Sequence, residues 1–434
     1  MPAISLAADT SRPASRYPGG IEPNLRRLRM ALAVIDCGSA HRAAGKLHLT
    51  QSSLTKAVQE LERAAEVPLF LRTSRGMVAT RFGHILAGRV RRALSHIEAA
   101  EQELREAGPE APPCAGFCGK VTHRQLAALI GIADHQTESG AARRMSLSQP
   151  AVTAALRELE RLAGSQLFHR TVKAMIPTAG GEILIRRAKL AFAEIMAAGS
   201  DMSSLQGQLT GRVVVGSLPM AGALLAPRAI NRLLREHPGL QVSVVEGTFQ
   251  SLIQGVLCGD VDIIIGALDY PTPPCDIVKE HLFDDRLSIV VRKGHRLASR
   301  ARLDMADLAG AQWVVPRAGT PARMYLDRIA GEAGLDLGSN PIESNSLFTV
   351  RTLLLESDRL AIISRHQIEI DESAELLQIL PLDLEGLSVP IGVGTRADGA
   401  PSAGVKAFLR HLHDLGDEID ASQAVRAQPL SKAG

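Results

Sequence analysis

Apolar side chains recur at helical spacing in the first part of the chain and predict three short helices in succession. On each expected helix the apolar positions share one face, and they are Leu28, Leu32 and Ile35, then Ala43, Ala44 and Leu47, then Leu54, Val58 and Leu61. A tight turn at Leu49–Gln51 precedes the third helix, with Thr50 as the expected N-cap. This spacing is typical of a helix–turn–helix unit.

The same pattern returns at a constant distance along the chain. Residues 25–94 align with residues 123–192 without a gap, and about 25 of some 70 paired positions are identical. After the third helix of each copy, Pro68–Thr80 and Gln166–Thr178 predict a basic β-hairpin. Thr80–Ala107 and Thr178–Gln206 then predict amphipathic helices of roughly 40 Å. We interpret the repeat as a duplicated structural unit.

A different pattern begins near Leu209. Short runs of Val and Ile alternate there with amphipathic stretches, and the expected strands are Val213–Val215, Val242–Val245, Val261–Ile265, Ser288–Val291, Trp313–Val315 and Leu360–Ile363. Alternation of strands and helices predicts a mostly parallel sheet with helices on its faces.

These patterns divide the chain into successive parts. We expect a disordered tail at residues 1–23, the first unit with its long helix at 24–107, and a Pro/Gly/Cys-rich linker at 108–119. The second unit follows at 120–208, an α/β domain at 209–416, and a frayed tail at 417–434.

Composition and charge narrow the class of protein. No stretch approaches 18 uninterrupted apolar residues and the N-terminus lacks an apolar signal core, which argues against a membrane span and for a bacterial cytoplasmic location. The five cysteines are scattered and indicate no disulfide framework. Residues 24–107 hold 14 Lys and Arg against 8 Asp and Glu, and residues 120–207 hold 11 against 7. The chain from residue 208 onward is net acidic, so the asymmetry favours a polyanion-binding first half.

Polar side chains lie on the face of each third helix opposite its apolar face. Hydroxyl, amide and cationic groups suit base edges and phosphates, and the candidates are Gln51, Ser52, Ser53, Thr55, Lys56 and Gln59 in copy 1 and Gln149, Pro150, Ala151, Thr153 and Arg157 in copy 2. The hairpins add cations that we expect to reach the phosphate backbone, namely Arg72, Arg75, Arg170 and Lys173. Incidental charge on an exposed hairpin is the alternative. We expect the neighbouring acids to face solvent or to cap a neighbouring helix, and these are Glu60, Glu62, Glu158 and Glu160.

In this combination the sequence resembles the LysR-type transcriptional regulators. The matching positions are Ala43, Ala44, Thr50, Gln51, Leu61, Glu62, Leu69, Phe70, Arg72 and Arg75 in copy 1, and Leu147–Ala151, Leu159, Glu160, Leu167, Phe168 and Arg170 in copy 2. The resemblance implies all-α, winged helix–turn–helix heads with long linker helices, followed by a two-lobed, periplasmic-binding-protein-like α/β effector domain. The chain departs from that family in carrying two heads, in Ser52, and in the Lys173–Ala174 pair. These departures leave open that one head is a weak reader or a structural partner, and we expect the more cationic copy 1 to make the stronger phosphate contacts.

Linker helices of the resembled family pair antiparallel across a dimer. About a dozen residues, reaching at most ~40 Å, connect the first long helix to the second head. We hypothesise that one polypeptide builds its own pseudo-dimer of heads. The alternative is an ordinary dimer that carries four heads.

The resemblance places lobe 1 of the effector domain at about 212–268 and 364–416, and lobe 2 at about 269–363, with closure around a ligand. Ligands in open α/β sheets bind at the carboxyl ends of strands, where we expect Ser217, Met220, Thr248, Phe249, Gly266, Arg317, Thr320, Asn345 and Ser346. Arg317 would bind a carboxylate in bidentate fashion. The alternative is that the hydroxyls only cap helices and that Arg317 is a surface cation.

The favoured function is DNA-binding transcriptional regulation, with a small organic acid or sugar as the effector between the lobes. The expected partners are double-stranded promoter DNA, the effector, RNA polymerase if the protein is an activator, and further copies of the chain in a homodimer or homotetramer. We expect no catalytic residues, cofactor or metal, because no catalytic motif is visible and Cys114 and Cys118 have poor spacing for zinc. The alternative is an enzymatic or solute-binding domain tethered to basic heads.

Overall fold

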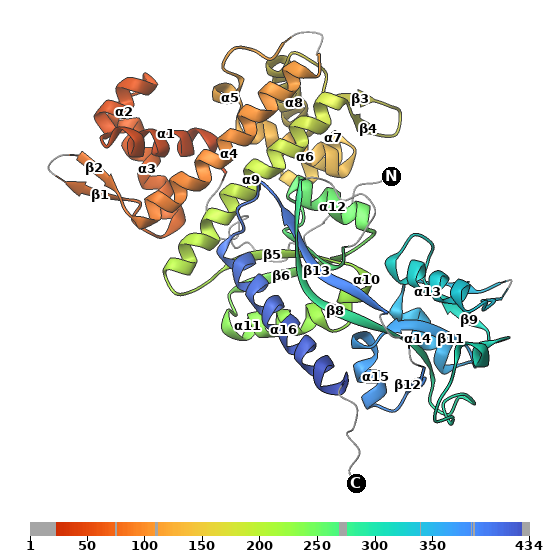
Figure 1. Ribbon diagram of the computed structural model, residues 1–434. Helices are drawn as coiled ribbons and strands as arrows, with labels where there is room; N and C mark the ends of the chain where they lie inside the picture. The colour runs from red at the N-terminus through yellow and green to blue at the C-terminus, as the bar shows by residue number, and fades with distance from the viewer. Residues whose placement is uncertain are drawn as a thin grey trace.

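The computed structural model describes residues 23–73, 76–108, 112–268, 276–338, 340–382, 384 and 387–427. Two helical heads lie at one end of the molecule and an α/β domain lies at the other (Figure 1). Residues 1–22 of the tail predicted at 1–23, and the hairpin residue Arg75, lie outside the described residues.

The first head consists of three helices, a hairpin and a long helix. Its elements are α1 Leu25–Cys37, α2 Ala40–Leu47, α3 Gln51–Ala65, β1 Phe70–Thr73, β2 Gly76–Ala79 and α4 Arg81–Glu106. The hydroxyl of Thr50 accepts a hydrogen bond from the backbone N–H of Ser53 at 3.3 Å, which confirms the predicted N-cap of α3. Leu54, Val58 and Leu61 are buried, as their spacing predicts.

The second head repeats this order of elements. It contains α6 His123–His135, α7 Glu138–Met145, α8 Gln149–Ala163, β3 Phe168–Arg170, β4 Met175–Pro177 and α9 Ala179–Leu205. The two copies share even the N-cap of the long helix. The hydroxyl of Thr80 accepts from the N–H of Gly83 at 3.1 Å in copy 1, and the hydroxyl of Thr178 accepts from the N–H of Gly181 at 3.0 Å in copy 2. Pro150 lies in the first turn of α8, where a missing N–H is tolerated.

The segment between the heads is more ordered than its composition suggests. Residues 117–120 form a short helix, α5 Phe117–Lys120, and the Phe117 side chain is fully buried in the core of the heads. The backbone N–H of Cys114 donates to the carbonyl oxygen of Leu162 at 2.9 Å. Residues 112–119 therefore join the two heads as an ordered segment, because one aromatic side chain fixes them to the core.

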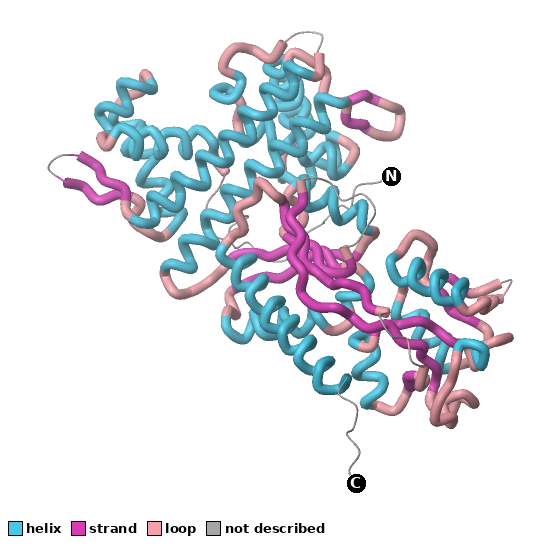
Figure 2. The backbone as a smooth tube through the Cα atoms, in the orientation of Figure 1, coloured by secondary structure: helices cyan, strands magenta, loops and turns pink. Residues whose placement is uncertain are grey.

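The long helices α4 and α9 lie side by side and antiparallel (Figures 1 and 2). Glu103 near the end of α4 binds Arg187 near the start of α9, and Arg89 near the start of α4 binds Asp201 near the end of α9. One continuous apolar core runs through both heads and both long helices. The pairing that an intrachain pseudo-dimer requires is thus present within one chain.

The α/β domain is built on a nine-stranded sheet with the order β10-β9-β11-β8-β13-β7-β5-β6, and β12 pairs with β8. The strands are β5 Gly211–Ser217, β6 Leu240–Glu246, β7 Ile263–Ala267, β8 Ile277–Arg292, β9 Trp313–Val315, β10 Ile342–Glu343, β11 Leu360–Ser364, β12 Leu377–Ile379 and β13 Ser388–Arg396. Strands β8 and β13 run antiparallel to their neighbours. The sheet is therefore mixed, and the prediction of a mostly parallel sheet is wrong.

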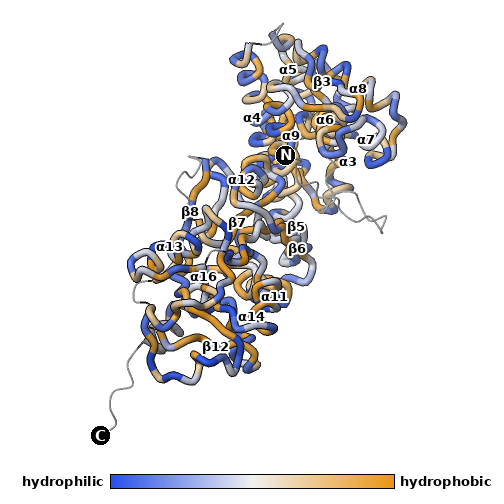
Figure 3. Tube along the Cα trace, turned by 90° about the vertical axis from the view of Figure 1, so that its right-hand side faces the viewer, coloured by the Kyte–Doolittle hydropathy of each residue, from blue (hydrophilic) through white to orange (hydrophobic). Residues whose placement is uncertain are grey.

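Helices cover the faces of this sheet. They are α10 Pro219–Gly222, α11 Leu225–Glu236, α12 Phe249–Cys258, α13 Pro321–Glu332, α14 Leu347–Leu355, α15 Glu369–Ser373 and α16 Ala403–Ala427, with two 3₁₀ turns, η1 Met305–Leu308 and η2 His366–Ile368. Strand β7 is apolar along its length and lies in the interior of the domain (Figure 3).

Strand β8 runs through both lobes and connects them. Its first part pairs with β13 in lobe 1, and its last part pairs with β11 and β12 in lobe 2. The chain returns to lobe 1 only after β12, with β13. The first crossing between the lobes therefore lies within β8 and not at residues 268/269, because this one strand is long enough to span both lobes. The second crossing lies between β12 and β13 and not at residues 363/364.

The last helix extends beyond the predicted end of the domain. α16 runs from Ala403 to Ala427, and both Leu415 and Ile419 are buried. The apolar periodicity continues past residue 416, so the prediction of a frayed tail is wrong for residues 417–427.

Candidate functional site: two helix–turn–helix heads and an interlobe cleft

The outer face of α3 gathers the polar residues predicted for head 1. Leu54, Ala57, Val58 and Leu61 hold the other face of the helix in the core, which leaves exposed Gln51, Ser52, Ser53, Lys56 and Gln59. A shallow surface hollow is lined by Gln51, Ser52, Thr55, Lys56, Gln59, Glu60 and Arg63. Arg63, which sequence analysis missed, follows Gln59 by four residues and therefore shares its side of the helix.

The hairpin of head 1 adds a cation beside this face. Arg72 lies on β1, is exposed, and forms no ion pair with a described residue. A free guanidinium on an exposed hairpin is available to a phosphate group.

The equivalent face of head 2 carries the candidates predicted from the repeat. Gln149, Pro150, Ala151 and Arg157 of α8 are exposed, as is Lys173 on the hairpin loop. Thr153 also lies on α8 and is half-buried.

Arg170 of head 2 differs from its counterpart Arg72, because an acid holds it. Its Nη2 donates to Oε1 of Glu138 at 2.8 Å, and the hydroxyl of Thr153 donates to Oε2 of the same carboxylate at 2.8 Å. Sequence analysis missed Glu138, whose counterpart in copy 1 is Ala40. The visible signal was an acid in the first turn of a short helix.

The glutamates of the third helices bind protein groups. Glu62 accepts hydrogen bonds from two backbone N–H groups at the start of the hairpin, at 2.9 and 3.0 Å, and Glu160 accepts the matching bond from Leu167 at 3.0 Å. Glu60 pairs with Arg27 of α1 at 2.9 Å. Two of these acids therefore cap a hairpin rather than the helix that we expected.

A mostly apolar cleft lies between the lobes. Its polar lining consists of Thr320, Ser344, Asn345, Ser364 and Gln367, and no side chain among the described lining residues is charged. Met220, Thr320 and Asn345 were predicted for this position. Ser344, Ser364 and Gln367 were not, because their approach depends on how the two lobes meet.

Two further candidates lie directly behind the cleft. Ser217 is buried at the end of β5, and Gly266 has φ +142, a conformation that favours glycine. A Cβ on Gly266 would overlap Leu218, which lines the cleft. These residues shape the wall without forming its surface.

The remaining candidates lie outside the cleft lining. Thr248 caps α12 by accepting from Ser251 N–H at 3.2 Å, and Phe249 packs in a separate apolar cluster. Both follow β6, the edge strand farthest from lobe 2, which explains why they are remote from the cleft. Arg317 is exposed and only its backbone N–H reaches Asn345, at 2.9 Å. Ser346 caps α14. For these residues, the helix-capping alternative describes the contacts.

Comparison with known proteins agrees with this architecture. The family model of the LysR substrate binding domain matches residues 206–417. The model of the bacterial regulatory helix-turn-helix protein, lysR family, matches twice, at residues 25–84 and 123–182. A transcriptional regulator named GalR from Pseudomonas putida is 35% identical over 393 residues, which cover 91% of this chain and 97% of GalR. The chain belongs to the LysR family of transcriptional regulators.

Two further proteins align with a smaller part of this regulator. PcaQ from Agrobacterium fabrum is 27% identical over 300 residues, which cover 69% of this chain and 96% of PcaQ. The structure of a full-length OxyR variant from Pseudomonas aeruginosa has a TM-score of 0.53 and 21% identity, and covers 68% of this chain and 94% of that one. The GalR alignment leaves out only 9% of this chain, which is fewer residues than one head with its long helix contains. The alignment therefore extends into both copies of the repeat.

The interface between the two linker helices of this LysR-family regulator is reciprocal. Arg89 and Arg187 occupy equivalent positions in the two copies, and so do Glu103 and Asp201. Nε of Arg89 donates to Asp201 Oδ2 at 2.7 Å, and Nε of Arg187 donates to Glu103 Oε1 at 2.8 Å. An interface in which each copy offers the same group to the other is isologous, as in a two-fold dimer. Here it forms within one chain.

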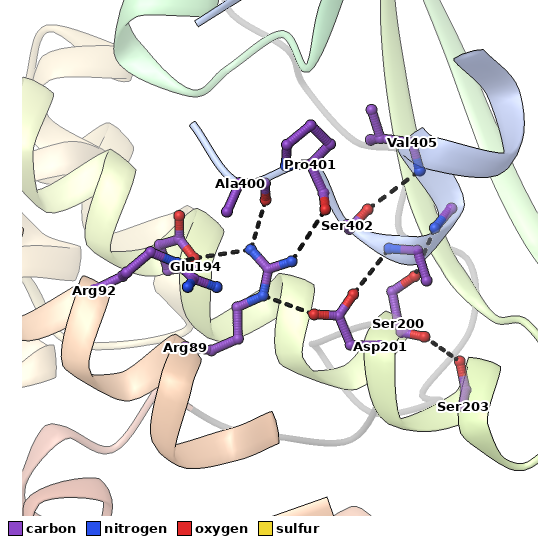
Figure 4. A network of polar contacts seen from close by, with 12 residues as sticks. Arg89, Arg92, Glu194, Ser200, Asp201, Ser203, Ala400, Pro401, Ser402 and Val405 are labelled. Atoms are coloured by element: carbon purple, nitrogen blue, oxygen red, sulfur yellow. Dashed lines mark hydrogen bonds and ion pairs between the residues drawn. The ribbon is translucent and has the colours of Figure 1, made fainter. Parts of the chain in front are cut away.

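The regulator's effector domain covers one of these two ion pairs. Arg89 is 3% exposed and also donates to Glu194 Oε2 at 2.8 Å and to the carbonyl oxygens of Ala400 at 2.7 Å and Pro401 at 3.2 Å (Figure 4). Burial opposes the charge, but the hydrogen bonds that Arg89 donates to the carboxylates of Asp201 and Glu194, with their negative charge, outweigh it and raise the pKa of Arg89. Both linker helices and the effector domain thus meet at one guanidinium.

Asp201 extends this network to the last helix. Its Oδ1 accepts from the N–H of Ala403 at 2.8 Å, and the hydroxyl of Ser200 accepts from the N–H of Gly404 at 3.3 Å (Figure 4). The first N–H groups of a helix have no partner within it. Helix α9 therefore caps α16, which connects head 2 rigidly to lobe 1.

A buried carboxylate lies where β8 passes between the regulator's lobes. Asp285 is fully buried, and its Oδ2 accepts from the hydroxyl of Ser364, which lines the cleft. Burial raises the pKa of Asp285 to about 7. Nearby, burial and then Arg228 lower the pKa of His366 to about 4. Both side chains therefore favour their neutral forms in this region.

Within the described residues, no group of His, Cys, Asp and Glu side chains is arranged to hold a metal ion. Over the same residues, no helix is long and apolar enough to cross a membrane.

Proposed function

We propose that this LysR-family regulator reads two half-sites of one promoter operator with a single polypeptide. The observation that carries the proposal is the reciprocal pairing of Arg89 with Asp201 and of Arg187 with Glu103. This pairing relates the two heads by an approximate two-fold axis, and such symmetry corresponds to a pseudo-palindromic DNA site. A further dimer of the chain would then carry four heads.

The chemistry of the two faces supports DNA as the partner. Glutamine and serine groups at the start of α3 suit base edges in the major groove, while Lys56 and Arg72 suit phosphates. Head 1 presents both kinds of group, and neither cation pairs with an acid among the described residues. Head 2 presents Gln149 and Arg157 in the positions of Gln51 and Gln59, but Glu138 holds Arg170, the counterpart of Arg72. We infer that head 1 contributes more of the phosphate-dependent affinity.

The matched glutamines provide the test. A promoter fragment selected by binding to the full chain is footprinted with Gln51→Ala and with Gln149→Ala, since these residues occupy equivalent positions on α3 and α8. Each variant should lose protection over a different half-site, and light scattering should find one chain per pair of half-sites. Loss of one common half-site in both variants, or two chains per pair, would contradict the proposal.

We further propose that the interlobe cleft binds a small organic acid or sugar that controls this activity. Thr320, Asn345, Ser364 and Gln367 offer hydroxyl and amide groups. Helices α13 and α14 begin at the cleft, where their N-termini favour an anionic group without a charged side chain. The two crossings between lobes give the hinge that closure requires.

A panel of small carboxylic acids and sugars, screened by thermal shift and calorimetry, tests this second proposal. Asn345→Ala should weaken binding of any compound that stabilises the chain, because its amide lines the cleft. Thr248→Ala is the matched control outside the cleft and should leave that affinity unchanged. Equal effects of the two variants would place the ligand elsewhere.

A further inference from the structure

The carboxylate of Glu138 joins three elements on the DNA-facing side of head 2. Glu138 lies in the first turn of α7, Thr153 lies on α8, and Arg170 lies on the hairpin strand β3. Each oxygen of the carboxylate accepts one bond at 2.8 Å, from the Thr153 hydroxyl or from Arg170. The Glu138 side chain is only 9% exposed, whereas that of Arg170 is 55% exposed. The acid therefore lies beneath the exposed guanidinium and holds it.

Head 1 provides an internal comparison. Residues Ala40, Thr55 and Arg72 occupy the three equivalent positions. The threonine and the arginine are retained, and only the acid is replaced. The hydroxyls of Thr55 and Thr153 both donate to the backbone oxygen four residues earlier, at 3.0 and 3.1 Å, but Thr153 alone of the two also donates to a carboxylate, and Arg72 forms no ion pair with a described residue. The difference between the heads therefore rests on one side chain.

We propose that Glu138 is an internal competitor of DNA phosphate in head 2. A carboxylate and a phosphate bind an arginine through the same charge-assisted hydrogen bonds. The N-terminus of a short helix is, in addition, a position that favours an anion from the protein or from a ligand. While Glu138 holds Arg170, the guanidinium is already neutralised, and a phosphate gains little from it. Head 2 then lacks the phosphate contact that Arg72 offers in head 1, and its hairpin contributes less to the non-specific affinity.

This inference rests on the proposal that both heads bind DNA, and the full chain tests it with a probe that needs no known operator. Binding to a duplex of about 40 base pairs and arbitrary sequence is measured across a range of salt concentrations, because phosphate contacts set both the affinity and its salt dependence. Glu138→Gln keeps the size of the side chain and removes its charge. It should lower Kd roughly tenfold at low salt and steepen the slope of log Kd against log salt by about 0.9, the value for one further phosphate.

Two more variants identify the group responsible. Arg170→Ala in the Glu138→Gln background should abolish the gain, and Ala40→Glu should weaken binding by a similar factor by giving head 1 the same acid. Circular dichroism verifies that each variant retains the helical content of the parent chain.

The possible results separate the inference from the proposed function. If Glu138→Gln weakens binding while Arg170→Ala also weakens it, the acid positions the arginine for DNA and the competition is refuted. If neither variant alters Kd or the salt slope, head 2 makes no phosphate contact through its hairpin, and the competition is refuted as well. In that case Gln149→Ala still reports separately whether head 2 reads its half-site.

Discussion

The buried guanidinium of Arg89 permits a quantitative test of how the heads and the effector domain are coupled. Arg89→Met keeps the length of the side chain but removes every donor. Asp201 and Glu194 then lose a cation, and the carbonyl oxygens of Ala400 and Pro401 lose their hydrogen bonds. Breaking a buried ion pair from one side costs about 3–5 kcal/mol, because the remaining charge stays buried without a partner.

Surviving contacts place the expected loss near the lower end of this range. Glu194 keeps Arg92 as a partner at 2.9 Å, and Asp201 keeps the N–H of Ala403 at 2.8 Å. We therefore expect Arg89→Met to lower the free energy of unfolding by about 3 kcal/mol.

The chain contains its own control for this substitution. Arg187 holds the equivalent position, but its side chain is 22% exposed, and Glu103 retains Arg186 at 2.6 Å. Water can solvate the charges that Arg187→Met leaves behind, so about 1 kcal/mol is expected. The predicted difference between the two variants, about 2 kcal/mol, reflects the burial of Arg89 together with its additional hydrogen bonds to Glu194, Ala400 and Pro401.

Urea unfolding followed by two probes measures this difference. Far-ultraviolet circular dichroism reports mainly the helices of the heads, while fluorescence of Trp313, the single tryptophan, reports lobe 2. Arg89→Met should lower the midpoint of the circular dichroism transition by roughly 1 M urea and shift the fluorescence midpoint less. Adding Asp201→Asn should recover part of the loss, since it removes an unpaired charge. Equal losses in Arg89→Met and Arg187→Met would refute the reasoning from burial.

Three further outcomes follow from the structure. Gly181→Ala should destabilise the second head by about 2 kcal/mol or more in thermal melts, because its Cβ would overlap the backbone before β3, whereas Gly88→Ala meets open space on α4 and should stabilise by up to ~1 kcal/mol. Burial raises the pKa of Asp285 to about 7, so the folded state binds its proton more tightly and stability falls as pH rises from about 4 to about 7; Asp285→Asn should remove that slope, and a variant with an unchanged slope in urea titrations would contradict it. Arg72→Ala should reduce the salt slope of DNA binding by about 0.9 and Arg170→Ala by less, and equal reductions would show that both hairpins contact phosphate alike.

Helix faces and helix caps could be predicted from the sequence because they depend on residues a few positions apart. Leu54, Val58 and Leu61 bury one face of α3 through their spacing alone, and Thr50 caps the helix beside them. The ungapped repeat predicted two copies of the same unit, and the structure retains even the paired caps of α4 and α9. The displaced lobe boundaries show where local reasoning ended, since they depend on which strands pair with β8.

Tertiary structure decided the polar contacts that matter most here. Arg89 meets Ala400 across 311 positions of the chain, and Arg170 meets Glu138 across 32. Such contacts depend on how whole helices pack, and no spacing within one element encodes them. For the same reason, the sequence could not distinguish the effector candidate Asn345, which lines the cleft, from Thr248, which caps a helix remote from it.

By itself, the sequence determined the family, the duplication and the faces that the third helices present, because periodicity and charge act over a few residues. Only the packed chain decided that the two linker helices pair with each other, that one guanidinium holds them to the effector domain, and that an acid neutralises one hairpin arginine. The physical reason is that an ion pair has a larger interaction energy when it is buried away from water, and a site becomes buried only when elements distant in sequence pack together.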